Sequence, residues 1–287
     1  SIGSEVSEFV RRLPDRKILI YHNITPPHFF RGINPEVERR CALGIEELKL
    51  LAPYFDLGLG VSEYNRQELE KVGFKKTGVL PIFLDFKDYY LAPEETLKKD
   101  LTDGRINILH VGRIAPQKRI EDLIRVFYLF QRRHRPDSRL LLVGTDSGMR
   151  NYGRALRNMA EELGLREKVT FAGFATFREL VTYYSQAHAY LCLSEHEGFC
   201  VPLMESMFFG LPVIAYVTGG ISETLGGAGI GLKEKNWEAI AETLALVVGD
   251  PAFREQIIAG QKERLQDLTL DKNSARLRVL LEPFLRK

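Results

Sequence analysis

The chain has 287 residues, of which 40 are Lys or Arg and 38 are Asp or Glu, so its formal net charge is +2. This length allows one large domain or two ordinary ones, and 45% hydrophobic with 27% charged residues is typical of a soluble globular protein. The composition excludes a disordered or collagen-like chain. The near-neutral charge excludes strong non-specific binding of nucleic acid, which needs a dominant basic surface.

Neither a membrane span nor a secretion signal is visible in the sequence. No apolar run approaches the roughly 18 residues that a span needs, and the N-terminus carries no apolar secretory core. The three cysteines, Cys41, Cys192 and Cys200, show no metal-ligand spacing. We therefore expect free thiols, no metal site and a cytoplasmic location. Basic clusters at residues 11–12 and 132–135 allow peripheral contact with anionic lipid, but ordinary solvated faces are the favoured interpretation.

Strand and helix patterns alternate along the chain. Apolar runs predict strands at residues 17–24, 57–61, 78–82, 106–111, 139–143, 169–172, 189–193 and 212–216. One predicted helix face is formed by Ile120, Leu123, Ile124 and Phe127, and a capping box by Thr176 and Glu179 opens another helix. Further helices are predicted at residues 203–209, 237–248 and 270–285. This alternation predicts an α/β fold whose parallel sheets are wrapped by helices.

The predicted organisation has two unequal lobes. Residues 105–267 hold five or more predicted strands, as expected of a complete α/β lobe. Residues 1–85 hold about three strands, which is thin for an independent domain of this class. Residues 86–104 are rich in Asp, Lys, Tyr and Pro without a clean period, so we interpret them as a linker, and residues 268–287 as a C-terminal helix.

The strongest local signal is the segment SEHEGFCVPLME at residues 194–205. Glu197 follows a predicted strand, and Glu205 lies one turn into a helix that begins near Pro202. Ligands of open α/β sheets bind at such strand ends. Carboxylates there can accept hydrogen bonds from neighbouring sugar hydroxyls, and Gly198 leaves room for backbone N–H groups. On spacing alone, a surface loop with a capping acid also fits this segment.

A second signal, HVGRIAPQK at residues 110–118, also follows a predicted strand. Gly112 turns the chain, and Arg113 and Lys118 flank the start of a predicted helix. Two cations beside a helix N-terminus suit a diphosphate. Taken alone, a pair of ordinary surface cations explains the segment equally well. Residues 226–229, which are rich in Gly, are expected to form a loop beside the same cleft.

Together these segments resemble the group 1 (family 4) retaining glycosyltransferases, which have two Rossmann-like lobes in the GT-B arrangement. The Gly-Arg-x4-Lys loop, the Glu-x7-Glu element and a downstream PVIA…TGGISET segment occur in the expected order, and the resemblance covers nearly all of residues 105–287. Against this family the N-terminal lobe is incomplete. We expect roughly 80 residues, including part of the acceptor site, to precede the sequence given.

The resemblance implies a role for each motif residue. Arg113 and Lys118 would hold the donor diphosphate and stabilise it as a leaving group, Glu197 would face the donor sugar, and Glu205 would bind the ribose diol. His22 would lie near the sugar and the diphosphate, with a cap of the following Pro-Pro turn as its alternative role. The other implied donor-binding residues are Gly112, Gly173, Phe174, Ala175, Gly198, Phe199, Cys200 and Val201, where Cys200 stands at a position that is Gly in many members.

Electrostatics favours a reaction without metal or other cofactor. A nucleoside diphosphate departs readily only when its growing negative charge is neutralised, and metal-dependent enzymes commonly use an Asp-x-Asp motif, which does not occur in this sequence. Arg113 and Lys118 can neutralise the charge without a metal. The three consecutive side chains at 195–197 do not easily converge on one ion.

The sequence therefore predicts a retaining hexosyltransferase that uses a UDP- or GDP-linked sugar and an acceptor glycan, lipid or small molecule. Its C-terminal helix is expected to cross back to the first lobe. Two alternatives stay open: another enzyme of GT-B type, such as a sugar phosphorylase or UDP-sugar epimerase, and a nucleotide-sugar-binding module without activity. A phosphate loop, a dinucleotide fingerprint and a hydrolase elbow do not occur in the sequence.

Overall fold

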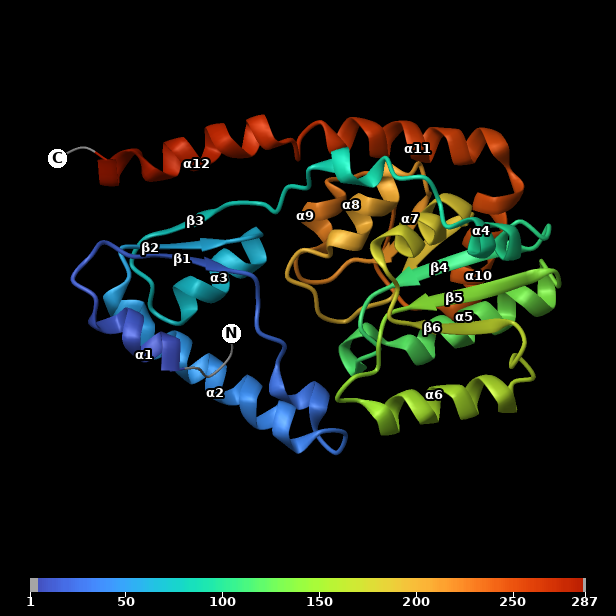
Figure 1. The fold of residues 1–287 in the computed structure, drawn as a ribbon, viewed down its shortest axis with the longest axis horizontal. Helices are drawn as coiled ribbons and strands as arrows, with labels where there is room; N and C mark the ends of the chain where they lie inside the picture. Colours follow the sequence, from blue (N-terminus) through green and yellow to red (C-terminus); the bar gives the residue numbers. More distant parts are fainter. Residues whose placement is uncertain (1–4, 286–287) are drawn as a thin grey trace.

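The computed structural model describes residues 5–285 and places them in two parallel sheets with helices against them (Figure 1). The strands are β1 (Ile18–Tyr21), β2 (Leu57–Gly60), β3 (Thr77–Val79), β4 (Ile106–Val111), β5 (Ser138–Val143), β6 (Val169–Gly173), β7 (Ala189–Cys192), β8 (Val213–Tyr216) and β9 (Ile230–Leu232). The predicted α/β class with parallel sheets is confirmed.

The helices occupy most of the remaining chain. They are α1 (Glu5–Arg12), α2 (Pro35–Leu51), α3 (Glu63–Lys71), α4 (Glu95–Leu101), α5 (Ile120–Arg133), α6 (Arg150–Glu162), α7 (Phe177–Gln186), α8 (Val201–Phe208), α9 (Ile221–Leu225), α10 (Trp237–Gly249), α11 (Pro251–Leu265) and α12 (Leu270–Leu285). Short 3-10 helices are η1 (Pro27–Phe30), η2 (Ala52–Tyr54), η3 (Phe86–Tyr89) and η4 (Pro116–Lys118). Within residues 5–285, no helix is both long and apolar enough to cross a bilayer.

The larger sheet has six parallel strands in the order β6-β5-β4-β7-β8-β9. The chain runs outward from β4 through β5 to β6, and then returns to the other side of β4 to form β7. Pairing between β4 and β7 ends at Leu109 and Tyr190, before either strand ends. The strand order thus reverses between β4 and β7, and open α/β sheets bind ligands outside the carboxyl ends of the strands at such a point.

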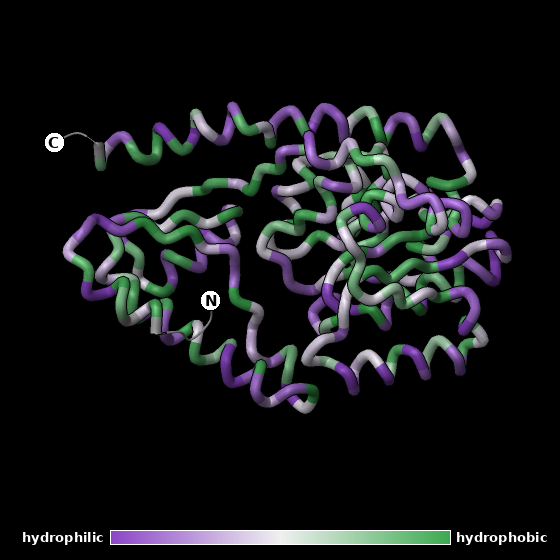
Figure 2. The backbone as a smooth tube through the Cα atoms, in the orientation of Figure 1, coloured by the Kyte–Doolittle hydropathy of each residue, from purple (hydrophilic) through white to green (hydrophobic). Residues whose placement is uncertain are grey.

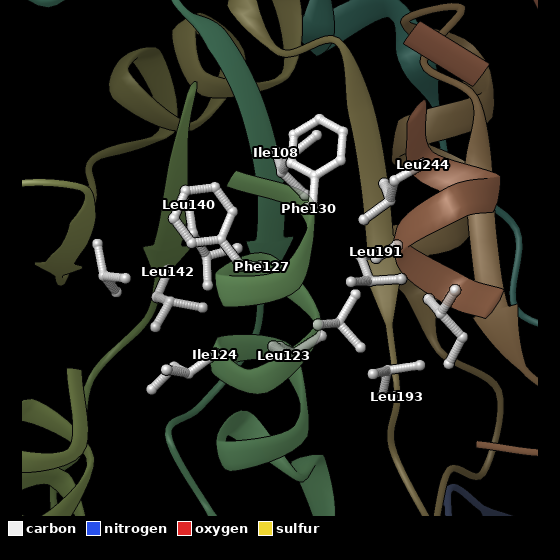
Figure 3. Packing of buried hydrophobic residues seen from close by; sticks show 14 of the residues in the cluster. Ile108, Leu123, Ile124, Phe127, Phe130, Leu140, Leu142, Leu191, Leu193 and Leu244 are labelled. Atoms are coloured by element: carbon white, nitrogen blue, oxygen red, sulfur yellow. The ribbon is translucent and has the colours of Figure 1, made fainter. Parts of the chain in front are cut away.

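Alternate residues of the central strands enter two different cores, because side chains of a strand point to opposite faces. One core contains Ile108, Leu140 and Leu142 together with helices α5 and α10. The predicted face of α5 is fully buried in it, and Figure 3 shows Phe127 against Leu140. The opposite core contains Leu109 with residues of α7, α8 and α9. Helices therefore cover both faces of the sheet and leave its carboxyl edge for ligands.

The smaller sheet has the order β1-β2-β3 and packs on α2 and α3 through a separate apolar cluster. The last helix, α12, runs back beside this sheet (Figure 1). Its Leu280 side chain lies over Gly78, where an added Cβ would meet it at 2.6 Å, and Lys76 lies 5.3 Å from the Phe284 ring centroid. Figure 2 shows that the tube is largely hydrophobic along the strands of both sheets.

Three segments differ from what the sequence indicates. Residues 95–101, inside the predicted linker, form α4, whose N-terminus is capped by Glu94 and which packs on α7. Strand β9 has three residues in a Gly-rich stretch, too few for a clear apolar pattern. The expectation that residues 226–229 form a loop beside the donor cleft is wrong. They precede β9 and lie beside Val213 at the start of β8, so they occupy the amino edge of the sheet.

Candidate active site

Two loops meet at the carboxyl edge where the strand order reverses. One follows β4 and spans residues 112–119, and the other follows β7 and spans residues 193–200. The backbone N–H of Glu195 donates to the carbonyl of Gln117 at 2.8 Å. The Lys118 ammonium donates to the Glu197 carboxylate at 2.6 Å between Nζ and Oε1. The two motifs singled out in the sequence therefore form one site.

The Lys118–Glu197 pair is shielded from water. Their side chains are 18% and 9% exposed. Burial lowers the pKa of the Lys118 ammonium, but the Glu197 carboxylate outweighs this effect and holds the pKa above its ordinary value of 10.5. Lys118 is therefore a fixed, largely buried positive charge in the loop after β4. A buried pair of this kind is costly to break by removing one partner.

The backbone of the loop after β4 packs closely against the backbone that follows β5. Gly144, which follows β5, has φ of 144° and lies so close to Gly112 that an added Cβ would meet the Gly112 carbonyl oxygen at 1.9 Å. Only glycine fits there without shifting the backbone. Arg113, which follows Gly112, is exposed and donates to the Ser147 carbonyl at 3.3 Å. Among the described residues it forms no ion pair, so its charge is available to a ligand.

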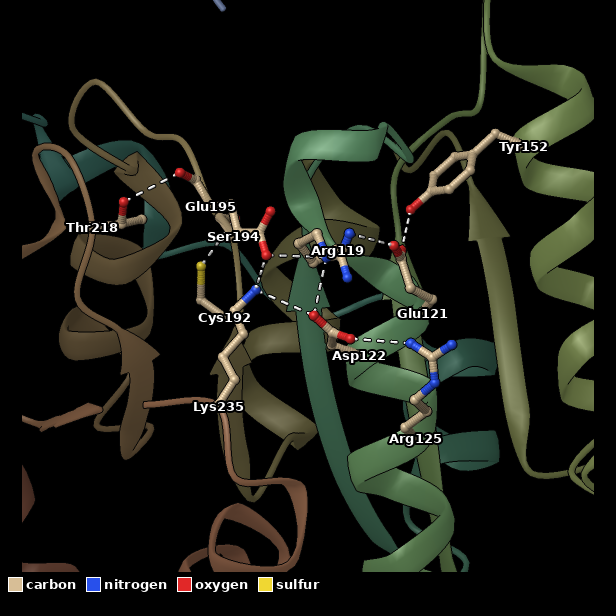
Figure 4. Close-up of polar contacts among 10 residues, drawn as sticks. All are labelled: Arg119, Glu121, Asp122, Arg125, Tyr152, Cys192, Ser194, Glu195, Thr218 and Lys235. Carbon is tan, nitrogen blue, oxygen red and sulfur yellow. Dashed lines mark hydrogen bonds and ion pairs between the residues drawn. The ribbon is translucent and has the colours of Figure 1, made fainter. Parts of the chain in front are cut away.

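An ion network ties the loop after β7 to helix α5 (Figure 4). Arg119 contacts Asp122 at 3.0 Å and Glu195 at 3.3 Å, while Lys235 contacts the same two carboxylates at 3.2 Å and 2.9 Å. Asp122 is 2% exposed. Burial raises the pKa of its carboxyl group, but the hydrogen bond and charge of Arg119, with the charge of Lys235, bring the pKa below its ordinary value. The network fixes the position of the residues on either side of Lys118 and Glu197.

Glu205 lies in the first turns of α8, as predicted, but its carboxylate is bound by two phenols. Tyr89 donates to Oε1 and Tyr184 donates to Oε2, both at 2.6 Å. Burial raises the pKa of both tyrosines, and the Glu205 charge adds to the effect. Tyr89 comes from η3, in the segment between the lobes. No local sequence pattern indicated these partners, because they come from elements distant along the chain.

The first lobe touches the loop after β7 through backbone and side chains. The carbonyl of His22 lies so close to Gly198 that an added Cβ would meet it at 2.5 Å, whereas the His22 imidazole is exposed. The histidine that joins the lobes through its side chain is His196, whose Nε2 hydrogen-bonds Asn23 Oδ1. Burial lowers the pKa of His196 to about 4, so the ring is neutral. Its place beside Glu197 was the only sequence signal for this residue.

A second contact between the lobes involves Glu223. The backbone N–H groups of Glu63 and Tyr64, at the start of α3, donate to its carboxylate at 2.6 Å and 3.2 Å. Ser62 caps the same helix, because its hydroxyl accepts from the Asn65 N–H at 3.2 Å. A carboxylate at a helix N-terminus is stabilised by the helix dipole. Nothing in the sequence indicated this partner for Glu223.

The other predicted donor-binding residues divide between surface and interior. Gly173 ends β6 at the carboxyl edge, Phe174 and Ala175 follow it, and Phe174 is 79% exposed. Phe199 and Cys200 are buried, with the Phe199 ring packed against Val61 and Met204. Val201 begins α8, and Gly112 and Gly198 lie in the two loops. The side chain of Phe199 therefore serves packing, and its carbonyl accepts a hydrogen bond from the Thr224 hydroxyl.

Comparison with known proteins decides the family. The family model described as "Glycosyl transferases group 1" matches residues 93–264, more than half of the chain. The chain belongs to the group 1 glycosyl transferases. Both loops of the site fall inside the matched region.

Several relatives of this glycosyl transferase are named. An uncharacterized glycosyltransferase of Methanocaldococcus jannaschii is 35% identical over 163 residues, which are 56% of this chain and 40% of that protein. The O-antigen chain mannosyltransferase B of Escherichia coli is 27% identical over 252 residues, 84% of this chain and 63% of that protein. The chain thus spans less than two thirds of these curated relatives.

Solved structures support the same architecture. Sucrose-phosphate synthase from Thermosynechococcus elongatus superposes with a TM-score of 0.78 at 23% identity, covering 96% of this chain and 70% of that one. The Anabaena protein HepE in complex with UDP and glucose gives 0.73 at 19% identity, covering 93% and 72%. At these identities the likeness establishes the fold, and this glycosyl transferase has the two-lobed arrangement that the resemblance implied.

Three side chains at the glycosyl transferase site carry atoms of the kind that bind metal ions, and their spacing in the sequence did not indicate that they meet. Cys192, Glu197 and Cys200 are all buried, and their ligand atoms lie within 4.8 Å of one another. The eight-residue spacing of the two cysteines has no metal-binding signature. They meet because one ends β7 and the other precedes α8.

Proposed function

We propose that this group 1 glycosyl transferase moves a hexose from a nucleoside-diphosphate sugar to an acceptor hydroxyl, with retention of anomeric configuration and without a metal cofactor. The observation that carries the proposal is the buried Lys118–Glu197 pair at the point of strand reversal, with the guanidinium of Arg113 in the same loop. Relatives named as a mannosyltransferase and a neighbour that holds UDP and glucose support this donor class.

In the proposed reaction, Arg113 and Lys118 neutralise the negative charge that grows on the departing diphosphate. Positioned cations of this kind stabilise the transition state without reorganising during the reaction. The diphosphate leaves from the face that the acceptor attacks, and its phosphate oxygen takes the acceptor proton. Glu197 accepts hydrogen bonds from the sugar hydroxyls and orients the ring. No carboxylate nucleophile is required in this scheme.

The nucleoside would lie along the carboxyl edge toward β6. Phe174, which is 79% exposed, offers an aromatic face for the base. Glu205 would bind the ribose diol, which requires its carboxylate to accept the ribose hydroxyls in addition to, or in place of, the phenol of Tyr89. His22 would approach the sugar from the first lobe. We also propose a cytoplasmic location, consistent with three free cysteines, all buried.

The proposal is tested by a thermal-shift screen with UDP, GDP and ADP and their hexoses, because a bound ligand raises the melting temperature by mass action. The nucleotide sugar that gives the largest shift is then incubated with sugar acceptors in the presence of EDTA. An α-linked product from an α-linked donor, identified by NMR, supports retention without metal. A β-linked product contradicts retention, and turnover that EDTA abolishes contradicts metal independence. Binding without any transfer would favour the binding-module alternative.

A further inference from the structure

Cys192, Glu197 and Cys200 form a compact, buried cluster at the loop after β7. Cys192 is the last residue of β7, Cys200 precedes the first residue of α8, and Glu197 lies in the loop between them. Their ligand atoms lie within 4.8 Å of one another. Bonds of about 2.0–2.3 Å to one zinc ion place tetrahedral ligand atoms about 3.5–4 Å apart. Small side-chain movements therefore suffice to enclose an ion.

The backbone at Cys200 directs its thiol into this cluster. Cys200 has φ of 73°, in the left-handed region that disfavours any residue with a Cβ. Among the described residues, only Asn23 and Arg119 share a positive φ without being glycine. The conformation turns the chain from the loop into α8 and brings the Cys200 sulfur to Cys192. The cluster is thus set by the same turn that positions Glu197.

The charges around the cluster suit a divalent cation. Glu197 Oε1 accepts from Lys118, and no hydrogen bond from residues 5–285 reaches Oε2, which is free to act as a ligand. Two thiolates and one carboxylate would carry one more negative charge than a divalent cation balances. The Lys118 ammonium, 2.6 Å from Glu197, neutralises that excess. Thiolate ligands select zinc and softer ions over magnesium or calcium.

We propose that Cys192, Glu197 and Cys200 bind a divalent cation of the zinc class, through two thiolates and one carboxylate. All three ligands are buried, Cys192 fully and Cys200 and Glu197 to within 7% and 8% exposed, so the bound ion would be shielded from water. Binding releases the two thiol protons to solvent. The ion has no part in sugar transfer.

A consequence of this site rests on the proposed function. If Glu197 orients the donor sugar, an ion that takes Glu197 competes with the nucleotide sugar. Zinc would then inhibit transfer reversibly, and a chelator would restore it. The metal site itself does not depend on this consequence, because its ligands are defined by contacts within the chain.

The test uses Co²⁺ as a spectroscopic probe on the whole chain, kept reduced and free of oxygen. Wild type is expected to bind one Co²⁺ with the thiolate charge-transfer and visible absorption of a tetrahedral site, and Zn²⁺ should displace it. Cys192→Ser and Cys200→Gly should each lose the thiolate band and weaken binding at least tenfold. Glycine suits the left-handed backbone at position 200. Cys41→Ser is the matched control, because Cys41 is a buried cysteine of α2 that is not a member of the cluster.

Each outcome bears on the site directly. Absence of the thiolate band in folded wild type would overturn the proposal, as would an unchanged band in folded Cys200→Gly or its loss in Cys41→Ser. Circular dichroism checks that each variant is folded. A nucleotide sugar is then titrated with and without Zn²⁺. A cobalt spectrum without competition refutes the overlap with Glu197, and a cobalt spectrum in a protein that binds no nucleotide sugar refutes the proposed function while supporting the metal site.

Discussion

Lys118 Nζ lies 2.6 Å from Glu197 Oε1, and this ion pair joins the loop after β4 to the loop after β7. Without a donor, the two charges neutralise each other in a shielded position. In the proposed reaction, the donor diphosphate would become the negative partner of Lys118, and Glu197 would then accept hydrogen bonds from the sugar hydroxyls. The pair therefore contains both charged groups that the proposed reaction uses. Variants of Lys118 and of Glu197 can test the role of each group separately.

Glu197→Gln should separate sugar positioning from diphosphate binding. The substitution keeps the shape of the side chain but removes the charge that neutralises Lys118. We expect transfer to fall by about 100-fold in kcat/KM, while the free nucleoside diphosphate binds at least as tightly as to wild type. Steady-state kinetics and calorimetry measure the two effects. Glu161→Gln on the exposed surface of α6 is the control. An equal loss of transfer activity and of nucleotide affinity would contradict the assignment of Glu197 to the sugar and not to the diphosphate.

Asp122→Asn should lower the stability of the folded protein. Asp122 is 2% exposed and contacts Arg119, Arg125 and Lys235, so the variant removes the buried negative charge that these three cations share. We expect a loss of about 3 kcal/mol in the free energy of unfolding, measured with urea at pH 7. Asp267→Asn, which removes exposed ion pairs with Arg264 and Lys272, should lower the free energy of unfolding far less. If both variants lost a similar amount of unfolding free energy, the buried network would contribute no more to stability than an exposed ion pair.

The effect of Asp122 should also depend on pH. Its pKa is below the ordinary value of 3.8 because the cations outweigh burial, so the unfolded chain takes up the proton first on acidification. The stability contributed by Asp122 is therefore present above pH 3.8 and is lost as pH falls through the lower pKa of the folded protein. The difference between wild type and Asp122→Asn should narrow only below pH 3.8. Narrowing already at pH 5 to 6 would be inconsistent with the depressed pKa.

His110 should make the protein sensitive to mild acid. Burial lowers its pKa from 6.5 to about 4; its Nδ1 lies 3.0 Å from the Leu191 carbonyl, and its Nε2 is buried without a partner in the described part of the chain. Between these two values the unfolded state binds more protons, so stability falls as pH falls from 6.5 to 4. In His110→Phe this slope should decrease by about 1 kcal/mol per pH unit. Urea unfolding of wild type and His110→Phe between pH 4 and 7 measures both slopes, and equal slopes would contradict this effect.

Tyr89→Phe should tighten nucleotide binding. The Tyr89 hydroxyl donates to Glu205, the carboxylate assigned to the ribose in the proposed function. Because a hydrogen bond contributes about 0.5–1.5 kcal/mol net, its removal should lower the Kd for the nucleoside diphosphate by roughly two- to tenfold. Calorimetry measures this change, with Tyr90→Phe, at an 80% exposed neighbour, as the control. Weaker binding by Tyr89→Phe would mean that the phenol supports the ligand instead of competing with it.

Much of the fold was predictable because local patterns decide it. Strand β4 and helix α12 have the predicted bounds, and the capping box at Thr176 is present. The two loops were also predictable as one site, since both follow strands and carry motif residues. Strand β9 was missed because three residues carry too little periodicity.

The partners of the site residues could not be predicted from the sequence. Tyr89 reaches Glu205 across 116 positions, and His196 reaches Asn23 across 173. The contact of Cys192 with Cys200 depends on a left-handed residue that no cysteine spacing indicates. These contacts arise when the two lobes and the loops pack together. The sequence identifies the chemical groups, and the tertiary structure decides which of them meet.

The most direct test of the central claim is transfer by the double variant Arg113→Ala/Lys118→Ala, using the nucleotide sugar chosen by the thermal-shift screen. If these two cations stabilise the departing diphosphate, turnover should fall by at least about 1,000-fold while the variant remains folded. Lys99→Ala, at an exposed lysine of α4, should transfer sugar at the wild-type rate. Transfer by the folded double variant within tenfold of wild type would contradict the assignment of the diphosphate to these loops.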